Sequence, residues 1–273
     1  MYQINSEVIS PFPFLPSARQ NSRIIAENSQ LLRSIVVSDS RYTVKIARER
    51  RKIDELLRLR YQVFNVELGN EPEDSFGIEK DEFDATSHHL IVIENATKRI
   101  VGGYRLRTTE SRGNGFYSSQ EFQLGDLPEN ILSQSVEIGR ACIASEHRHG
   151  KVLFLLWKGL AQYLRKTKKR YFFGCCSLFS RDSSDGIRAF NQLEKGGFLH
   201  EDIRLDALKT NNIEDFGKFN EEIELPKLFN TYLRIGAKVC SPPVIDSEFG
   251  TIDFFVLFDS QKINEKYRKL FFA

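Results

Sequence analysis

Two charged residues, Glu137 and Arg140, interrupt a segment of small, aliphatic and β-branched residues that runs from Val136 to Ile143. This composition predicts a buried strand. A carboxylate in such a place can take a proton from a reacting group, and a guanidinium can bind or orient a carboxylate. We therefore predict that Glu137 and Arg140 are catalytic, with Glu137 as the base, directly or through a water. The alternative is a structural ion pair between Glu137 and either Arg140 or Arg105.

A polar turn follows this strand and leads into a helical pattern. The turn spans Ser145 to Gly150 and contains Arg148, and Lys151 stands at the start of the helix. From Val152 onward, apolar residues recur at helical spacing. The first N–H groups of a helix lack partners and lie at the positive end of its dipole, so an anion can bind there. We predict that this turn holds a phosphate-bearing carrier, and that the other half of the chain brings an amine to it.

Further charged residues come before the central strand. Arg60 lies on or beside the apolar stripe of a predicted helix that also carries Phe64. Asp81 and Asp84 follow in an acidic loop, where they could hold the amine of a cationic substrate. Arg105 lies in a later strand and, like Arg60, could bind a substrate carboxylate. Structural roles stay open for all of them: ion pairing for the arginines, and a solvated loop for the aspartates.

The periodicity predicts an α/β (α+β) architecture with a mixed central sheet. Strands are predicted over 42–47, 89–94, 100–108, 136–143, 171–178, 239–244 and 252–258, with a loop at 245–250; helices are predicted over 48–68, 152–164, 183–195 and 228–235. The strands at 89–94 and 100–108 should form an antiparallel hairpin. Residues 1–40, which hold three of the eight prolines, are predicted to be an N-terminal arm, and 41–273 one domain.

Net charge, cysteine spacing and the apolar segments argue against nucleic-acid binding, a metal site and a membrane span. The net charge is only +2, with 39 basic and 37 acidic residues, so no global field attracts nucleic acid. The four cysteines show no metal-ligand spacing, and we predict buried reduced thiols and no metal site. Cys142 has no histidine at motif spacing, which argues against a nucleophilic role. We see no signal peptide and no membrane span, so we predict a cytoplasmic protein with at most peripheral contact at the inner face of the membrane.

The chain is rich in phenylalanine, with 22 such residues against one Met and one Trp. This suggests pockets or faces built from aromatic rings. An acyl tunnel could be lined by Phe64, Phe83, Phe116, Phe122 and Trp157, although a packed core explains such residues equally well.

The order helix, hairpin, strand, turn and helix is that of the GNAT acyltransferase fold, whose central sheet is mixed, mostly antiparallel and flanked by helices. Four motifs resemble the signature of N-acylhomoserine lactone synthases: RYQVF at 60–64, EKDEFD at 79–84, VGGYRL at 101–106 and EIGR at 137–140. The resemblance implies catalysis around the last motif. It implies that the substrate-binding residues are Arg60, Phe64, Asp81, Asp84 and Arg105.

A longer resemblance is to the ornithine–acyl carrier protein N-acyltransferases of ornithine-lipid synthesis, often called haemolysin-like. Stretches such as DEFDATSHHLIV, GFYSSQEF, EIGRACI, LLWKGLAQYL and YFFGCCS occur in order between Tyr42 and the C-terminus. The resemblance implies transfer of a long, 3-hydroxylated acyl chain from acyl carrier protein to the α-amine of an amino acid, usually ornithine, giving a lyso-aminolipid. It implies no permanently bound cofactor, because the acyl-carrying phosphopantetheine arm is a co-substrate.

The turn departs from the general GNAT pattern of Gln or Arg, two residues, Gly, one residue, then Gly or Ala. The corresponding positions run from His147 to Val152, so one glycine is missing and Arg148 is out of step by one. This departure argues against coenzyme A and for a carrier protein. We expect His147 and His149 to be exposed. The predicted contacts of the carrier arm are Ile143, Arg148, Gly150 and Lys151.

Other functions stay open. A lactone-forming signal synthase shares the core motifs, but those enzymes are shorter, and the block from 225 to 259 argues for the lipid group. Relatives may differ in the acceptor, for example glycine in place of ornithine. A non-enzymatic alternative is a degenerate fold that binds a carrier protein or a membrane surface.

Overall fold

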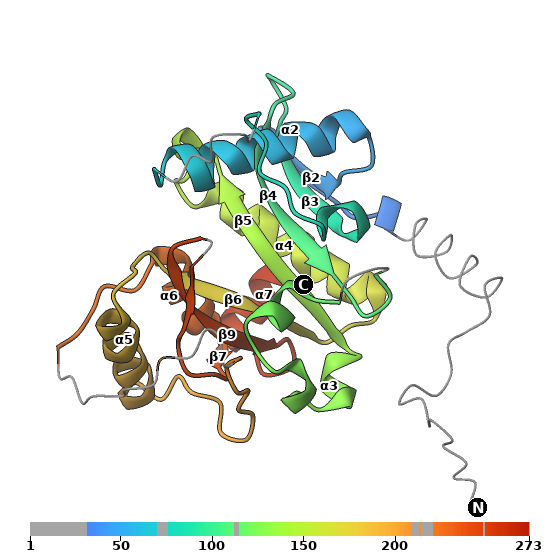
Figure 1. Cartoon of the computed structure of the whole chain (residues 1–273). Coiled ribbons are helices and arrows are strands. Elements are labelled where there is room, and N and C mark those ends of the chain that lie inside the picture. Colours follow the sequence, from blue (N-terminus) through green and yellow to red (C-terminus); the bar gives the residue numbers. More distant parts are fainter. Residues whose placement is uncertain are drawn as a thin grey trace, which may run out of the picture.

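The computed structural model describes residues 32–69, 76–111, 115–208, 213, 221–247 and 249–272. Within these residues, nine strands form one sheet in the order β1-β2-β3-β4-β5-β6-β9-β7, with β8 also paired to β9 (Figure 1). The strands are β1 (Val36–Ser38), β2 (Tyr42–Ile46), β3 (His88–Glu94), β4 (Ile100–Arg107), β5 (Ser135–Ile143), β6 (Tyr171–Leu178), β7 (Lys238–Val239), β8 (Val244–Asp246) and β9 (Thr251–Asp259). All paired strands are antiparallel except β5 and β6, which confirms the predicted mixed, mostly antiparallel sheet.

Helices cover both faces of this sheet. They are α2 (Arg50–Tyr61), α3 (Glu129–Leu132), α4 (Lys151–Thr167), α5 (Ser183–Lys195), α6 (Lys227–Ile235) and α7 (Glu265–Phe271). The α2 helix packs through Leu56 on Ile91 and Cys142, whereas α4, α6 and α7 pack on the opposite face, behind the sheet in Figure 1. None of the helices in the described part of the chain is long and apolar enough to cross a bilayer.

The α4 helix anchors the core because its apolar residues recur on one side. Val152, Leu155, Leu156 and Leu160 are all buried against the sheet. Gly159 lies in the middle of this side, and a Cβ there would come within 2.9 Å of a Val44 methyl group. The missing side chain therefore lets the helix approach strands β2 and β3 closely.

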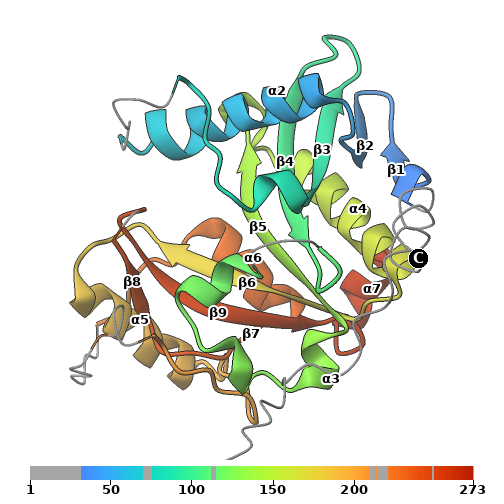
Figure 2. The same ribbon diagram turned by 45° about the vertical axis from the view of Figure 1, so that its right-hand side comes forward.

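The feature that creates the site is the separation of β5 from β6. The two strands are paired in parallel only from Ser135 to Glu137 on β5, opposite Tyr171 to Phe173 on β6. Beyond these pairs they diverge, as Figure 2 shows plainly. Strands β5 and β6 are still close together at Gly174, where any Cβ would collide with the carbonyl oxygen of Ile138. A cavity lined by residues of both strands lies where they separate.

Most predicted elements are confirmed, including the hairpin of β3 and β4 and the helices α4, α5 and α6. The strand predicted over 239–244 is wrong: β7 ends at Val239, β8 begins at Val244, and Pro242 and Pro243 in between cannot donate ladder hydrogen bonds. Helix α7 was not predicted. The predicted helix 48–68 is α2 continued by the π-helix η1 (Gln62–Val66).

The predicted arm falls largely outside the described residues, since residues 1–31 are not among them. Its last part belongs to the sheet. Leu32 and Ile35 are buried in the main core, and β1 pairs with β2.

Candidate active site

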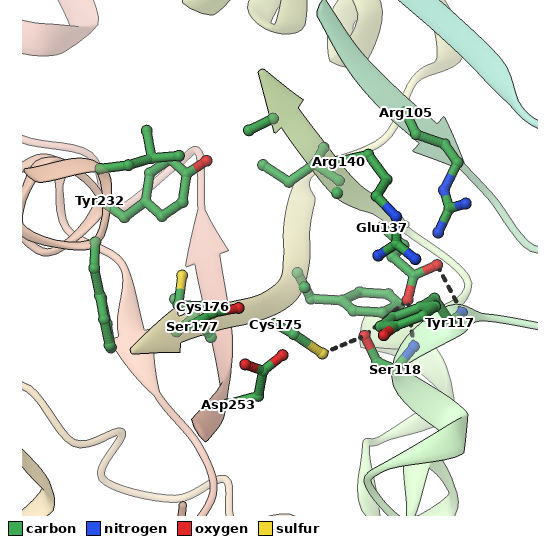
Figure 3. A pocket seen from close by; sticks show the side chains of 18 of the residues that line it. Arg105, Tyr117, Ser118, Glu137, Arg140, Cys175, Cys176, Ser177, Tyr232 and Asp253 are labelled. Atoms are coloured by element: carbon green, nitrogen blue, oxygen red, sulfur yellow. Dashed lines mark hydrogen bonds between the residues drawn. The ribbon is translucent and has the colours of Figure 1, made fainter. Parts of the chain in front are cut away.

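A cavity of about 210 Å³ occupies the opening between β5 and β6 and passes from one face of the sheet to the other. Residues alternate along each strand, so the two faces offer different walls. We call the face that carries Glu137, Cys175 and Asp253 the polar face, and the face that carries Phe172 and Val256 the apolar face. Figure 3 shows the labelled side chains around this cavity.

Glu137 lies on the polar face, 5% exposed, and its carboxylate is held by the first two residues of the 3-10 helix η3 (Tyr117–Gln120). The Tyr117 backbone N–H donates to Oε2 at 3.0 Å, and the Ser118 N–H and hydroxyl donate to Oε1 at 2.8 and 2.7 Å. Figure 3 shows these bonds as dashed lines. The carboxylate is thus fixed in position while it lines the cavity. The ion pairs of Arg105 and Arg140 go to other acids, so the alternative pairing of Glu137 with them does not form.

The remaining predicted charges form one buried network beside the cavity. Arg60, only 1% exposed, binds Glu79 and also Asp84 at 2.6 Å. Arg105 binds Asp81 at 2.5 Å and Asp84 at 3.5 Å. Burial opposes ionisation of Asp84, but the guanidinium groups of Arg60 and Arg105 prevail and lower its pKa to about 2. The arginines and aspartates predicted to bind substrate are therefore brought together, with Arg60 and Asp84 bound to each other.

Arg140 connects this network to the cavity. Its guanidinium donates to Glu79 at 3.0 Å and to Asp81 at 3.1 Å, and lies between the rings of Tyr117 and Phe249, 4.5 and 4.3 Å from their centroids. Its backbone has a φ of 50°, next to an irregularity in the β4–β5 register. A left-handed residue within a strand marks a β-bulge, which re-aims side chains and is common beside active sites. Burial opposes the charge of Arg140, yet Glu79 and Asp81 raise its pKa.

The apolar face of the cavity is lined by rings. Trp157 of α4 lies edge-on to Phe172 and Phe258, with centroid separations of 6.3 and 5.8 Å, and also contacts Tyr232 of α6. Phe64, from the π-helix η1, also lines the cavity. Of the five aromatic residues suggested for an acyl tunnel, Phe64 and Trp157 line the cavity. Phe83, Phe116 and Phe122 are buried elsewhere and are not part of its wall.

The predicted carrier turn lies at the start of α4, next to the far end of β5. Gly150 adopts a φ of 88° before the helix, and no side chain caps the first turn. Arg148 donates to the carbonyl oxygen of Ile143 at 2.8 Å and pairs with Glu67, and Lys151 pairs with Asp39 at 3.0 Å. Both basic side chains remain 43–49% exposed, so they are accessible to an approaching anion.

One expectation for the turn is wrong. His147 is buried, 5% exposed, and its Nδ1 is hydrogen-bonded to the Tyr42 hydroxyl at 2.8 Å. His149 is exposed, as expected. Cys142 is buried, and burial raises the pKa of its thiol to about 12, in accord with a packing role.

The structure adds acids that sequence reasoning missed. Asp246 and Asp253 line the cavity on the polar face, and Glu121 lies beside them. Burial, reinforced by the two aspartates, raises the pKa of Glu121 to about 9. Burial and Asp246 likewise raise the pKa of Asp253 to about 6. Glu121 stands within GFYSSQEF, so the motif could have drawn attention to it, but nothing in the sequence joins it to β9.

The buried Glu121 should make stability depend on pH. In the unfolded chain the carboxyl group loses its proton near pH 4.5, whereas the folded chain keeps it to about pH 9. The folded state therefore binds more protons between these values, and the free energy of unfolding falls as pH rises through this window. In the Glu121→Gln variant the free energy of unfolding should decrease less steeply as pH rises. Melting temperatures measured from about pH 5 to about pH 9 test the prediction; the control Glu201→Gln, at an exposed position, should keep the wild-type slope.

Comparison with known proteins shows what the chain is similar to. Residues 59–158 match the acetyltransferase (GNAT) domain family. An L-ornithine N(alpha)-acyltransferase of Rhodobacter capsulatus is 29% identical over 248 residues, covering 84% of this chain and 94% of the relative. One of Brucella abortus is 29% identical over 242 residues, covering 82% and 86%. Among solved structures, the AHL synthase LasI has a TM-score of 0.46 and 13% identity, covering 86% of this chain and 96% of that chain.

Proposed function

Because the chain is an acyltransferase of the GNAT fold and is related to L-ornithine N(alpha)-acyltransferases, we propose that it transfers an acyl chain from a thioester donor to the α-amine of ornithine. The observation that carries this proposal is the cavity that crosses the sheet. Its apolar face offers a ring-lined space for an acyl chain, and its polar face offers fixed carboxylates for an amine. The two reactants would meet at the edge of β5.

The reaction forms a C–N bond and breaks a C–S bond. In our proposal the amine nitrogen attacks the thioester carbonyl, Glu137 takes the proton directly or through a water, and the carrier leaves as a thiolate that is then protonated. The edge of β5 that faces β6 has no strand partner beyond Glu137 among the described residues, so its backbone N–H groups can stabilise the oxyanion. Arg140, held by Glu79 and Asp81, would position the acceptor beside Glu137.

We propose acyl carrier protein as the donor. Its phosphopantetheine arm would place a phosphate at the uncapped start of α4, near Arg148, Gly150 and Lys151. The arm would then pass Ile143 to reach the cavity. Coenzyme A would need room for a second phosphate-rich group on a turn that lacks one of the usual glycines. We further propose a long, 3-hydroxylated chain and a lyso-aminolipid product, which the resemblance to the ornithine-lipid enzymes implies.

Peripheral membrane contact belongs to the proposal as well. Phe179 and Leu68 line the cavity and remain 63% and 40% exposed. Apolar side chains at a cavity mouth suit the release of an amphiphilic product into a lipid surface.

The apolar face should set the length of the acyl chain. Ala237 is 2% exposed and lines the cavity near Tyr232. Replacing it with leucine should fill part of the space and shift the preferred donor to a chain shorter by several carbons, at a stability cost of about 1–3 kcal/mol. Relative rates with carrier proteins loaded with different chains measure this. An unchanged preference, in a folded variant, would place the acyl chain elsewhere.

A purified assay tests the proposed function. The chain is incubated with L-ornithine and either long-chain acyl-acyl carrier protein or the matching acyl-coenzyme A, and products are identified by mass spectrometry. We expect N-acylornithine, formed faster from the carrier protein. Glycine and S-adenosylmethionine serve as competing acceptors, because they represent a simple N-acyl amino acid synthase and a lactone-forming synthase. Preferential acylation of either would overturn the ornithine assignment.

A further inference from the structure

Three acidic side chains gather on the polar face, away from the Arg60 network. Asp253 of β9 and Asp246 of β8 are 3% and 7% exposed, and Glu121 is 3% exposed. One carboxylate oxygen of Glu121, one of Asp253 and the Sγ of Cys175 all lie within 4.8 Å of one another. Cys175 and Asp253 both line the cavity, and Figure 3 shows them on neighbouring strands beside Ser118. Cys175, Asp246 and Asp253 therefore border the same cavity as Glu137, and Glu121 lies directly beside two of them.

Glu121 is the member that lacks a strong donor. Neither of its carboxylate oxygens accepts a hydrogen bond from an N–H or O–H group of the described residues, although Glu121 is only 3% exposed, and the group beside it is the weakly donating thiol of Cys175. Asp253 accepts a bond from the Thr251 hydroxyl at 3.0 Å, and Asp246 accepts one from the Tyr117 hydroxyl at 3.0 Å. A buried carboxylate without a strong donor is costly, so its presence points to a ligand that supplies the donors.

The ligand must also supply positive charge. Arg140 is the basic side chain that acts on both Glu121 and Asp253, but its guanidinium already binds Glu79 and Asp81. The elevated pKa of Glu121 reflects this unbalanced burial of acids. A cation entering from the cavity would relieve the repulsion and favour ionised carboxylates.

We propose that Glu121 and Asp253, with Asp246 beside them, form a subsite that binds the side-chain ammonium of a diamino acid acceptor. The inference rests on the proposed function and deepens it, because it says how a cationic acceptor is chosen. An ammonium group donates three hydrogen bonds, which matches a pocket of carboxylate oxygens.

The strand geometry sets this subsite at a suitable distance from Glu137. Phe173 pairs with Glu137, and Cys175 follows two residues later on the same face of β6, about 7 Å along the strand at 3.3 Å per residue. A short aliphatic chain between two amines spans a gap of this size. The α-amine can then lie at Glu137 while the side-chain ammonium lies at Glu121 and Asp253, which leaves the wrong amine unreactive.

The test compares L-ornithine with L-norvaline, which has the same carbon chain but no side-chain amine. The readout is the ratio of kcat/KM for the two acceptors with one acyl donor. We expect the wild-type chain to prefer ornithine, and Glu121→Gln and Asp253→Asn each to lower the ratio roughly 10- to 100-fold. The control Glu201→Gln, at an exposed position, should leave the ratio unchanged.

Each outcome decides the matter. A wild-type ratio near one, or a ratio that Glu121→Gln leaves unchanged in a folded protein, would overturn the subsite while the proposed function stands. Acylation of neither amino acid would show that the proposed function has failed and the subsite with it. Metal analysis of the purified chain gives a further check: a stoichiometric ion that is lost in Glu121→Gln would show that the acids and Cys175 bind a metal instead.

Discussion

Replacing Glu137 with glutamine should lower kcat by roughly 100- to 10,000-fold, the contribution expected of a general base. Glutamine keeps the shape of the side chain and an oxygen that can accept from Ser118, so the fold should survive. It removes the ability to take a proton from the attacking amine. Steady-state rates with saturating ornithine and acyl donor measure the loss, and the melting temperature checks the fold.

The hydrogen bonds around Glu137 supply the control. Ser118→Ala removes one of the three donors to the carboxylate but leaves the carboxylate in place. It should reduce kcat only modestly, whereas Glu137→Gln should cause the large loss given above. If Glu137→Gln turns over at nearly the wild-type rate, Glu137 is not the base and the mechanism above is wrong.

Replacing Arg60 with methionine should destabilise the fold by about 3–5 kcal/mol, the largest stability effect we expect from a single change at the site. Methionine keeps much of the length and apolar volume. The Arg60→Met substitution leaves Glu79 and Asp84 buried without the cation that both of them bind. Chemical denaturation at neutral pH measures the change in the free energy of unfolding.

A second arginine of the same helix gives the matched comparison. Arg50 pairs with Asp54 at 2.9 Å, but its side chain is 81% exposed. Arg50→Met should cost less than about 1 kcal/mol, because exposed ion pairs contribute little. Equal effects of the two substitutions would mean that the buried network does not stabilise the fold as we argue.

Lowering the pH should reduce the contribution of the same network to the free energy of unfolding. The pKa of Asp84 is lowered from 3.8 to about 2, since burial is outweighed by Arg60 and Arg105. Its contribution to stability is therefore present above about pH 3.8 and is lost as pH falls through about 2. This agrees with a structural role for Arg60 and Asp84, which position the wall of the cavity behind Arg105 and Arg140.

The parts of the fold that the sequence could predict are those governed by local periodicity. Helix α4 and the hairpin of β3 and β4 carry regular apolar spacing, and GNAT-like motifs gave their order. The segment after Val239 could not be predicted in the same way, because its apolar residues include Pro242 and Pro243, which end a strand. Helix α7 spans seven residues and buries none of them fully, so its apolar pattern was weak.

The candidate site could be proposed from sequence where its residues share a strand or a motif. Glu137 and Arg140 stand on β5, and the motifs pointed to them directly. The acids of the polar face are different, since Glu121, Asp246 and Asp253 lie on three separate elements. They meet only because β9 runs antiparallel beside β6 and the loop at η3 folds over both. Such long-range pairing leaves no local signal in one sequence.

The most direct test of the central claim uses ornithine labelled with heavy nitrogen at only one of its two amines. Tandem mass spectrometry of the product then shows which nitrogen carries the acyl chain. The account predicts acylation of the α-nitrogen alone, with the side-chain amine free. Acylation of the side-chain nitrogen, or of both without preference, would contradict the arrangement of base, thioester and cavity described above.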